Sequence, residues 1–450
     1  MLRLALGALR TRTASFAGLA MTLLLAVAVI TLFGSLIAAA LGTGGDSRLA
    51  MIGGAFGEIA MLMALFVVAN TLGFSVRQQY RDIALLRTSG ATPVQIKRLV
   101  RGQVLLVTLL VSPAAWLLGA WGARRFLAEL VTRGVAPASA GVPWSPLPML
   151  IGTVATMLVG VGAAKAAARR TVRGRPSAAV DQTAAEHGGL GWVRGIAGLL
   201  SLTGAGVLCG FITRQPVDKA AQAALLGALL LMIAVGMLGP LLARAAVGLL
   251  GVPLRLASRR HRGEAGGWLA ATNLLGHAHR LASAVVPIAL LVGLSMTFTA
   301  ITGTIQHAAA QAVPQGAQSA SDVWLRGVEL TMLAGFGAVA TVNTLVSLTA
   351  TRRREYALLT LIGATRRQLF RMLGAEAVVT AMAGALLGVL VAAPVSVAFA
   401  LAATDGPWPW LPLQTYGPLV LGAMALAASS ILLSGWWAAT RPALSAVAAP

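Results

Sequence analysis

Apolar runs of twenty or more residues recur along the whole chain. Hydrophobic residues make up 57% of the 450 residues and charged residues 11%, which lies outside the usual range of soluble globular domains. Because a helix needs about twenty apolar residues to cross the hydrocarbon core of a bilayer, the sequence predicts an all-α polytopic membrane protein. Ten membrane-spanning helices are expected, at about residues 16–41, 55–76, 103–123, 147–168, 193–212, 221–248, 283–305, 325–350, 376–402 and 415–439.

The basic residues are unevenly distributed between the two sides of this predicted membrane protein. The net charge is +22, and if the N-terminus is placed inside, 7 of the 35 Lys and Arg fall in external segments and 28 (35 minus 7) in cytoplasmic ones. This is the bias of the positive-inside rule, so a multi-pass protein with cytoplasmic N- and C-termini is expected. The lipid bilayer then accounts for the basic charge, and no nucleic-acid partner is expected. The use of arginine over lysine, together with abundant alanine, favours the cytoplasmic membrane of a bacterium.

The first apolar run has two interpretations. Ala38-Ala39-Ala40 resembles the cleavage site of a signal peptide, but the run is longer than the apolar core of most signal peptides. Arg12-Thr13-Ala14-Ser15, directly before the run, is echoed by Arg280-Leu281-Ala282-Ser283 before another apolar run. A retained first transmembrane helix is therefore expected.

One stretch of the chain occurs twice. Residues 70–103 and 343–376 align without a gap at a constant offset of 273 (343 minus 70). Both copies share Asn-Thr-Leu at the start, then an acidic residue, Ala-Leu-Leu, Gly-Ala-Thr and a glutamine, each at the same offset. This agreement over the whole stretch indicates an internal duplication.

Each copy predicts a helix, a tight turn and a second helix. Gly90 and Gly363 stand where a helix commonly ends in the left-handed conformation. Thr92 and Thr365 follow two residues later, each with a glutamine three positions further on, which is the pattern of a capping box. Arginines occur throughout both copies and keep them out of the hydrocarbon, so each turn is expected at the membrane surface.

The duplication also organises the rest of the chain. Four predicted helices surround each copy and a two-helix hairpin lies between the two groups, which gives a 4+2+4 arrangement with a parallel internal repeat. The expected parts are a first four-helix module at residues 1–170, a basic linker with the central hairpin at 171–260, and a second four-helix module at 261–450. The external loops between the first two helices of each module are too short for a folded domain.

Residues 352–368 follow the pattern R-x-x-[DE]-x-A-L-L-x-x-x-G-A-T-x-x-Q directly after a predicted transmembrane helix. Because a close copy of this pattern occurs at the earlier position, the chain resembles the FtsX/MacB-type ABC transporter permeases. Its arrangement is similar to that of ten-helix members with two modules, except that a large extracytoplasmic domain is missing. The first copy departs from the family, with Gln79 in place of Arg352 and Gln103 in place of the acidic Glu376.

The resemblance implies that each short helix is a coupling helix, which docks on a separate cytoplasmic ABC ATPase. Two copies in one chain imply two ATPase subunits. A capped surface turn with ordinary anchoring arginines is the alternative, and the duplication favours docking. The expected docking residues are Arg81, Asp82, Leu85, Leu86, Gly90, Ala91 and Thr92 in the first copy and Arg352, Glu355, Leu358, Leu359, Gly363, Ala364 and Thr365 in the second.

The sequence indicates no catalytic or metal site in the chain itself. The phosphate-binding pattern G-x-x-x-x-G-K-[ST] is missing, since the three lysines, Lys97, Lys165 and Lys219, all lack the glycine before them. The five histidines are scattered, and the one cysteine, Cys209, lies in an apolar run. A non-catalytic subunit without a cofactor of its own is therefore expected, with ATP and Mg²⁺ bound by the partner ATPase.

Three functions stay open from the sequence. ATP-driven export or extraction of an amphipathic, lipid-like or peptide substrate is the leading hypothesis. The same machinery could instead signal across the membrane without moving a substrate, together with an unidentified extracytoplasmic or sensor partner. An ion-driven secondary transporter is the third, but it would be expected to have carboxylates near the membrane midplane, and Glu58 and Glu329 lie near the outer ends of their helices.

Two glycine pairs have the spacing that permits close packing of transmembrane helices. They are Gly206 with Gly210 and Gly384 with Gly388. Because the chain contains 51 glycines, such spacings are expected often, and the spacing alone does not separate a contact from a coincidence.

Overall fold

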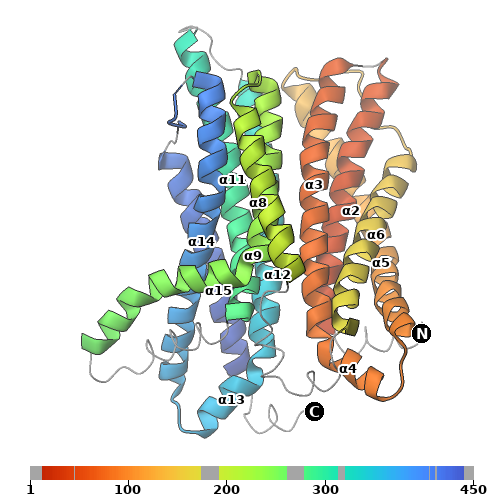
Figure 1. Cartoon of the computed structure of the whole chain (residues 1–450). Coiled ribbons are helices and arrows are strands. Elements are labelled where there is room, and N and C mark those ends of the chain that lie inside the picture. The colour runs from red at the N-terminus through yellow and green to blue at the C-terminus, as the bar shows by residue number, and fades with distance from the viewer. Residues whose placement is uncertain are drawn as a thin grey trace. The chain divides into compact units, whose positions relative to one another are not determined.

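The computed structural model describes residues 13–44, 46–173, 192–260, 278–312, 320–404, 406–410 and 413–439. Within these ranges the regular structure is entirely helical (Figure 1), so the predicted all-α fold is confirmed. The helices are α2 (Thr13–Gly42), α3 (Ser47–Gln78), α4 (Tyr80–Thr88), α5 (Pro93–Thr132), α6 (Leu147–Arg173), α8 (Trp192–Ile212), α9 (Val217–Arg260), α11 (Ala278–Ala312), α12 (Ala320–Thr351), α13 (Arg353–Leu361), α14 (Arg366–Thr404) and α15 (Leu413–Ala439).

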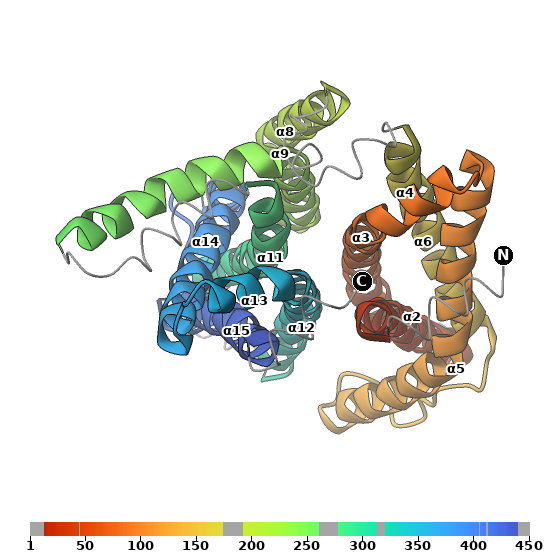
Figure 2. The ribbon, with the colours of Figure 1, turned by 90° about the horizontal axis from the view of Figure 1, so that it is seen from below.

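Ten of the described helices are long and apolar enough to cross a membrane, as the sequence predicted. The two others, α4 and α13, have nine residues each and are far too short to span a bilayer. In each unit the short helix lies across one end of the helical bundle (Figure 2): α4 connects α3 to α5, and α13 connects α12 to α14.

The spanning helices that follow the two turns are much longer than predicted. α5 has 40 residues and α14 has 39, whereas the sequence predicted separate helices at 103–123 and 376–402. The difference arises because the second helix of each repeated stretch continues into the membrane span with no helix-breaking residue between them. Each short helix is therefore followed by one continuous helix that reaches from the turn into the span, with Pro113 inside α5 and Pro394 inside α14.

The chain divides into two compact units, and the first comprises Met1–His187. In this unit α2 packs against α3, α5 and α6, and α6 also contacts α3 and α5. α2 and α5 approach closely at Gly119, where an added Cβ would lie 2.5 Å from the carbonyl oxygen of Ala28. Between α5 and α6, Trp116 donates a hydrogen bond from Nε1 to Thr153 Oγ1 at 2.9 Å. The described part of the first unit is thus a four-helix bundle that carries α4.

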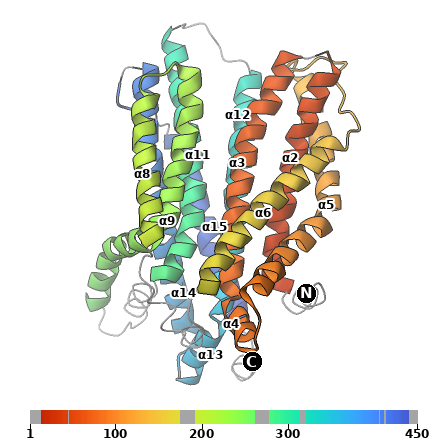
Figure 3. The same cartoon turned by 45° about the vertical axis from the view of Figure 1, so that its right-hand side comes forward.

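The second unit comprises Gly188–Pro450 and is built around α11. Within the span of α11, Ala284–Ala308, an 18-residue window is 94% buried, because α9, α12, α14 and α15 all pack against this helix. The hairpin of α8 and α9 belongs to this unit (Figure 3), since α9 packs on both α11 and α14. Residues 174–191 of the predicted linker lie outside the described residues. The 4+2+4 arrangement and the three-part division of the chain stay predictions.

Candidate functional site

Each short helix ends at a glycine in the left-handed region of backbone space. The φ angle is +94° at Gly90 and +103° at Gly363. In the second unit Gly363 N donates to Thr360 O at 3.2 Å, and Ala364 N donates to Leu359 O at 3.0 Å. These two bonds form a Schellman motif, and the first unit repeats both at the equivalent positions. The predicted glycine ends of both helices are confirmed.

The conformation of Gly363 predicts an effect of substitution. We expect Gly363→Ala to destabilise the turn by roughly 1–2 kcal/mol, because a Cβ is strained in the left-handed region. The control is Gly374→Ala in α14, where an added Cβ would meet nothing within 4 Å and the gain of helix propensity should stabilise by roughly 0.5–1 kcal/mol. Thermal unfolding of the full chain in detergent measures both. Equal shifts for the two variants would contradict the assigned turn.

The helix after each turn begins with the predicted capping box. Thr92 Oγ1 accepts from Gln95 N at 3.4 Å, and Gln95 Oε1 accepts from Thr92 N at 2.9 Å. In the second unit Thr365 Oγ1 accepts from Gln368 N at 3.3 Å, and Gln368 Oε1 accepts from Thr365 N at 2.9 Å. Both turns therefore have hydrogen-bonded backbone groups on each side.

The two short helices expose matched leucines. Leu85 is 57% exposed and Leu358, its equivalent at the offset of 273, is 45% exposed. The positions two residues earlier face inward, since Ile83 and Tyr356 are both fully buried. In the second unit Ile362 is 84% exposed, which enlarges the apolar surface there. An exposed leucine at the same position of both turns, next to arginines and outside the spanning segments, is suited to contact with another protein.

The other predicted docking residues lie around these leucines. Gly90, Thr92, Gly363 and Thr365 are exposed, while Leu86, Ala91, Leu359 and Ala364 are half-buried. The side chains of Arg81 and Asp82 lie outside the described residues. The prediction that all of these residues contact a partner stays a prediction.

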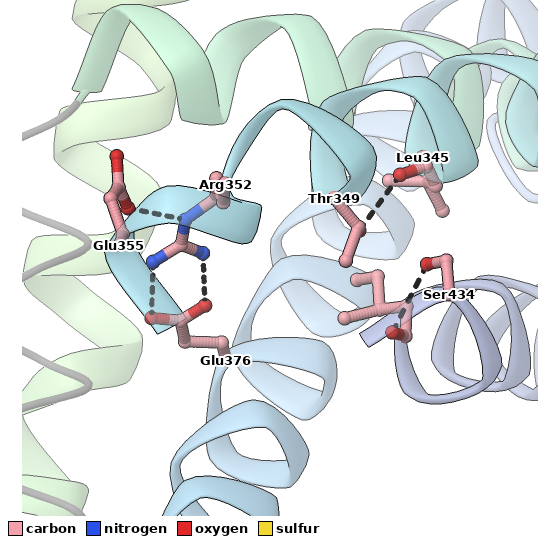
Figure 4. Close-up of polar contacts among 7 residues, drawn as sticks. Leu345, Thr349, Arg352, Glu355, Glu376 and Ser434 are labelled. Carbon is pink, nitrogen blue, oxygen red and sulfur yellow. Dashed lines mark hydrogen bonds and ion pairs between the residues drawn. The ribbon is translucent and has the colours of Figure 1, made fainter. Parts of the chain in front are cut away.

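Arg352 and Glu355 are part of an ion-pair cluster (Figure 4). The Arg352 guanidinium donates to Glu376 from Nη1 to Oε2 at 2.5 Å and from Nη2 to Oε1 at 3.2 Å, and from Nε to Glu355 Oε2 at 3.0 Å. Its Cζ also lies 5.2 Å from the ring centroid of Tyr356. Burial by itself lowers the pKa of Arg352, but hydrogen bonds and charge from Glu376, with smaller effects of Tyr356 and Glu355, raise the pKa above its ordinary value. The guanidinium therefore stays charged and ties the start of α13 to α14.

Sequence reasoning missed two features of this site. Tyr356 was not expected to matter, although it is a buried aromatic residue where the first copy has Ile83. Glu376 was compared with the family pattern, but its partner could not be identified because 24 residues separate it from Arg352. Both charged residues are replaced by glutamine in the first copy, and this joint replacement is the sequence signal that could have paired Arg352 with Glu376.

The fold and the turns together define a class of protein: a multi-pass membrane protein with a duplicated, capped helical turn outside its spans. The model of the FtsX-like permease C-terminal family matches residues 54–176 and 327–444, together more than half of the chain. The chain belongs to the FtsX-like permease family. The two matches begin 273 residues apart (327 minus 54), which is the offset of the internal repeat. No curated protein matches the chain.

Membership of the FtsX-like permease family indicates the general function of the chain. FtsX-like permeases are non-catalytic membrane subunits of ABC systems and work with an ABC ATPase. Groups of three or more His, Cys, Asp or Glu that could hold a metal ion are missing among the residues that the structure describes.

Proposed function

We propose that the chain is the permease of an ABC exporter, and that α4 and α13 each dock one copy of a cytoplasmic ABC ATPase. The observation that carries this proposal is the pair of matched, exposed leucines, Leu85 and Leu358, on capped turns outside the spans. We place the chain in the cytoplasmic membrane of a bacterium, with both termini in the cytoplasm, because this orientation leaves most Lys and Arg inside.

The continuity of α5 and α14 supports a mechanical role for the turns. A force applied to a capped turn acts on a helix that runs without interruption into the membrane. α14 packs along α11, the buried centre of the second unit. A shift of α13 would therefore move α14 against α11, and a shift of α4 would move α5 against α2. ATP binding and hydrolysis in the partner could then be transmitted without a catalytic group in this chain.

The short external loops support a substrate that is taken from the bilayer. α2 ends at Gly42 and α3 begins at Ser47, while α11 ends at Ala312 and α12 begins at Ala320. Segments of this length cannot form a capture domain, so an amphipathic, lipid-like or peptide substrate would enter between helices. Signalling without transport is the alternative, and it predicts ATP hydrolysis without release of any lipid or peptide from the membrane.

The proposal is tested by ATP hydrolysis in vesicles that contain the chain and a candidate ABC ATPase. We expect the chain to raise the hydrolysis rate above that of the ATPase alone, and Leu85→Glu/Leu358→Glu to remove this increase, because a charge replaces the apolar contact. The control is Trp408→Glu, at an exposed apolar position at the other end of the second unit. Collapse of ion gradients with an ionophore should leave the rate unchanged. Activity that depends on the gradient and not on ATP would favour a secondary transporter.

A further inference from the structure

The ion-pair cluster of the second unit has an uncharged counterpart in the first. At the offset of 273, Arg352 corresponds to Gln79 and Glu376 to Gln103, so both charges are replaced by amides. Tyr356, whose ring lies beside the guanidinium, corresponds to Ile83. The three members of one cluster therefore change together, although 24 residues separate the first from the last.

Solvent exposure does not explain this difference. Glu376 and Gln103 are both 3% exposed, and Tyr356 and Ile83 are 1% and 2% exposed. The same positions are therefore buried in both units, but they hold Glu376 and Tyr356 in the second unit and Gln103 and Ile83 in the first. A bidentate pair between arginine and a carboxylate fixes distance and angle, and its hydrogen bonds are about twice as strong as those between neutral groups. Amides and an isoleucine provide no such fixed geometry.

The short helix of the second unit is also held by apolar packing. In the second unit Tyr356 belongs to a buried apolar cluster with Leu369, Met372 and Leu373 of α14, and Leu432 of α15 packs against it. α13 is thereby held by α14 and α15. The ion pair and this apolar cluster therefore both attach the second turn to the rest of its unit.

We propose that Arg352, Tyr356 and Glu376 are positioning residues that make α13 the rigid turn of the protein, whereas α4 is the compliant turn. The consequence for transport rests on the proposed ATPase docking: with one ATPase subunit on each turn, the two subunits act on the permease unequally. The subunit on α13 transmits most of its movement into α14. The subunit on α4 transmits less of its movement into α5, because the compliant turn deforms.

The rigidity is measured without any ATPase, by hydrogen exchange of the full chain in lipid nanodiscs. We expect the amides of α13 to exchange at least about tenfold more slowly than those of α4 after correction for intrinsic rates, from the extra strength of hydrogen bonds to charged groups. Arg352→Gln/Glu376→Gln should speed exchange in α13 toward the rate of α4. Gln79→Arg/Gln103→Glu should slow exchange in α4 and leave α13 unchanged. Equal rates in the unaltered chain, or a double variant without effect on α13, would overturn the proposal.

The unequal transmission is measured by ATP hydrolysis of the complex with one turn disabled at a time. We expect Leu358→Glu to remove most of the stimulation by the chain and Leu85→Glu to remove much less. In the Arg352→Gln/Glu376→Gln background the two losses should become equal. Equal losses in the unaltered chain would overturn unequal transmission while leaving docking intact. If neither variant weakens ATPase binding, the proposed docking itself is wrong, whatever the exchange rates are.

Discussion

Arg352→Gln is expected to destabilise the second unit by about 3–5 kcal/mol, the usual cost of removing one partner from a buried ion pair. The side chains of Arg352 and Glu376 are only 19% and 4% exposed, so solvent screens the pair weakly. Without the guanidinium the Glu376 carboxylate stays buried beside a neutral amide. Thermal unfolding of the full chain in detergent should show the loss as an earlier transition of the second unit.

The double variant Arg352→Gln/Glu376→Gln is the control for this prediction. It copies the residues that the first unit carries, and neutral replacement of both partners of a buried pair is often close to neutral for stability. We therefore expect it to recover most of the stability lost in Arg352→Gln. A double variant as unstable as the single one would show that the two charges do not stabilise each other.

Gly384→Val is expected to have the second large effect, about 1–3 kcal/mol of destabilisation or more. An added Cβ at this position would lie 2.5 Å from Ile288 Cβ and 2.6 Å from Ile288 Cγ2. Those atoms are close to the backbone of α11 and cannot move aside without moving the helix. Gly388 makes a similar approach, with Val292 Cβ at 2.7 Å from the ideal Cβ position. The variant should therefore separate α14 from α11 and lower both the unfolding temperature and the stimulation of the ATPase.

The matched control is Gly206→Val in α8. Gly206 and Gly210 have the same spacing as the α14 pair, but an added Cβ at either would meet nothing within 4 Å. We expect little change in stability for this variant. If Gly206→Val and Gly384→Val destabilise the protein equally, the close packing of α11 on α14 is not what holds the second unit together.

These two predictions mark the limit of what the sequence could provide. Long apolar runs identify spanning helices by themselves, and the glycine ends and capping boxes depend on residues three or four positions apart, so both were predictable. The partner of Arg352 lies 24 residues away on another helix, and the two glycine pairs have identical spacing. For the ion pair and for the glycine pairs alike, only the packing of the helices in the structure shows which residues are in contact. The lengths of α5 and α14 were missed for a related reason, because hydropathy marks the apolar span and not the polar extension of the same helix.

The central claim is that each repeated turn docks one ATPase subunit, and native mass spectrometry of the purified complex tests it most directly. The account predicts two ATPase copies per chain for the unaltered protein, one for Leu85→Glu and one for Leu358→Glu, and none for the double variant. Trp408→Glu should retain both. Two bound copies in the double variant would contradict the account, because the exposed leucines of α4 and α13 would then have no part in binding the ATPase.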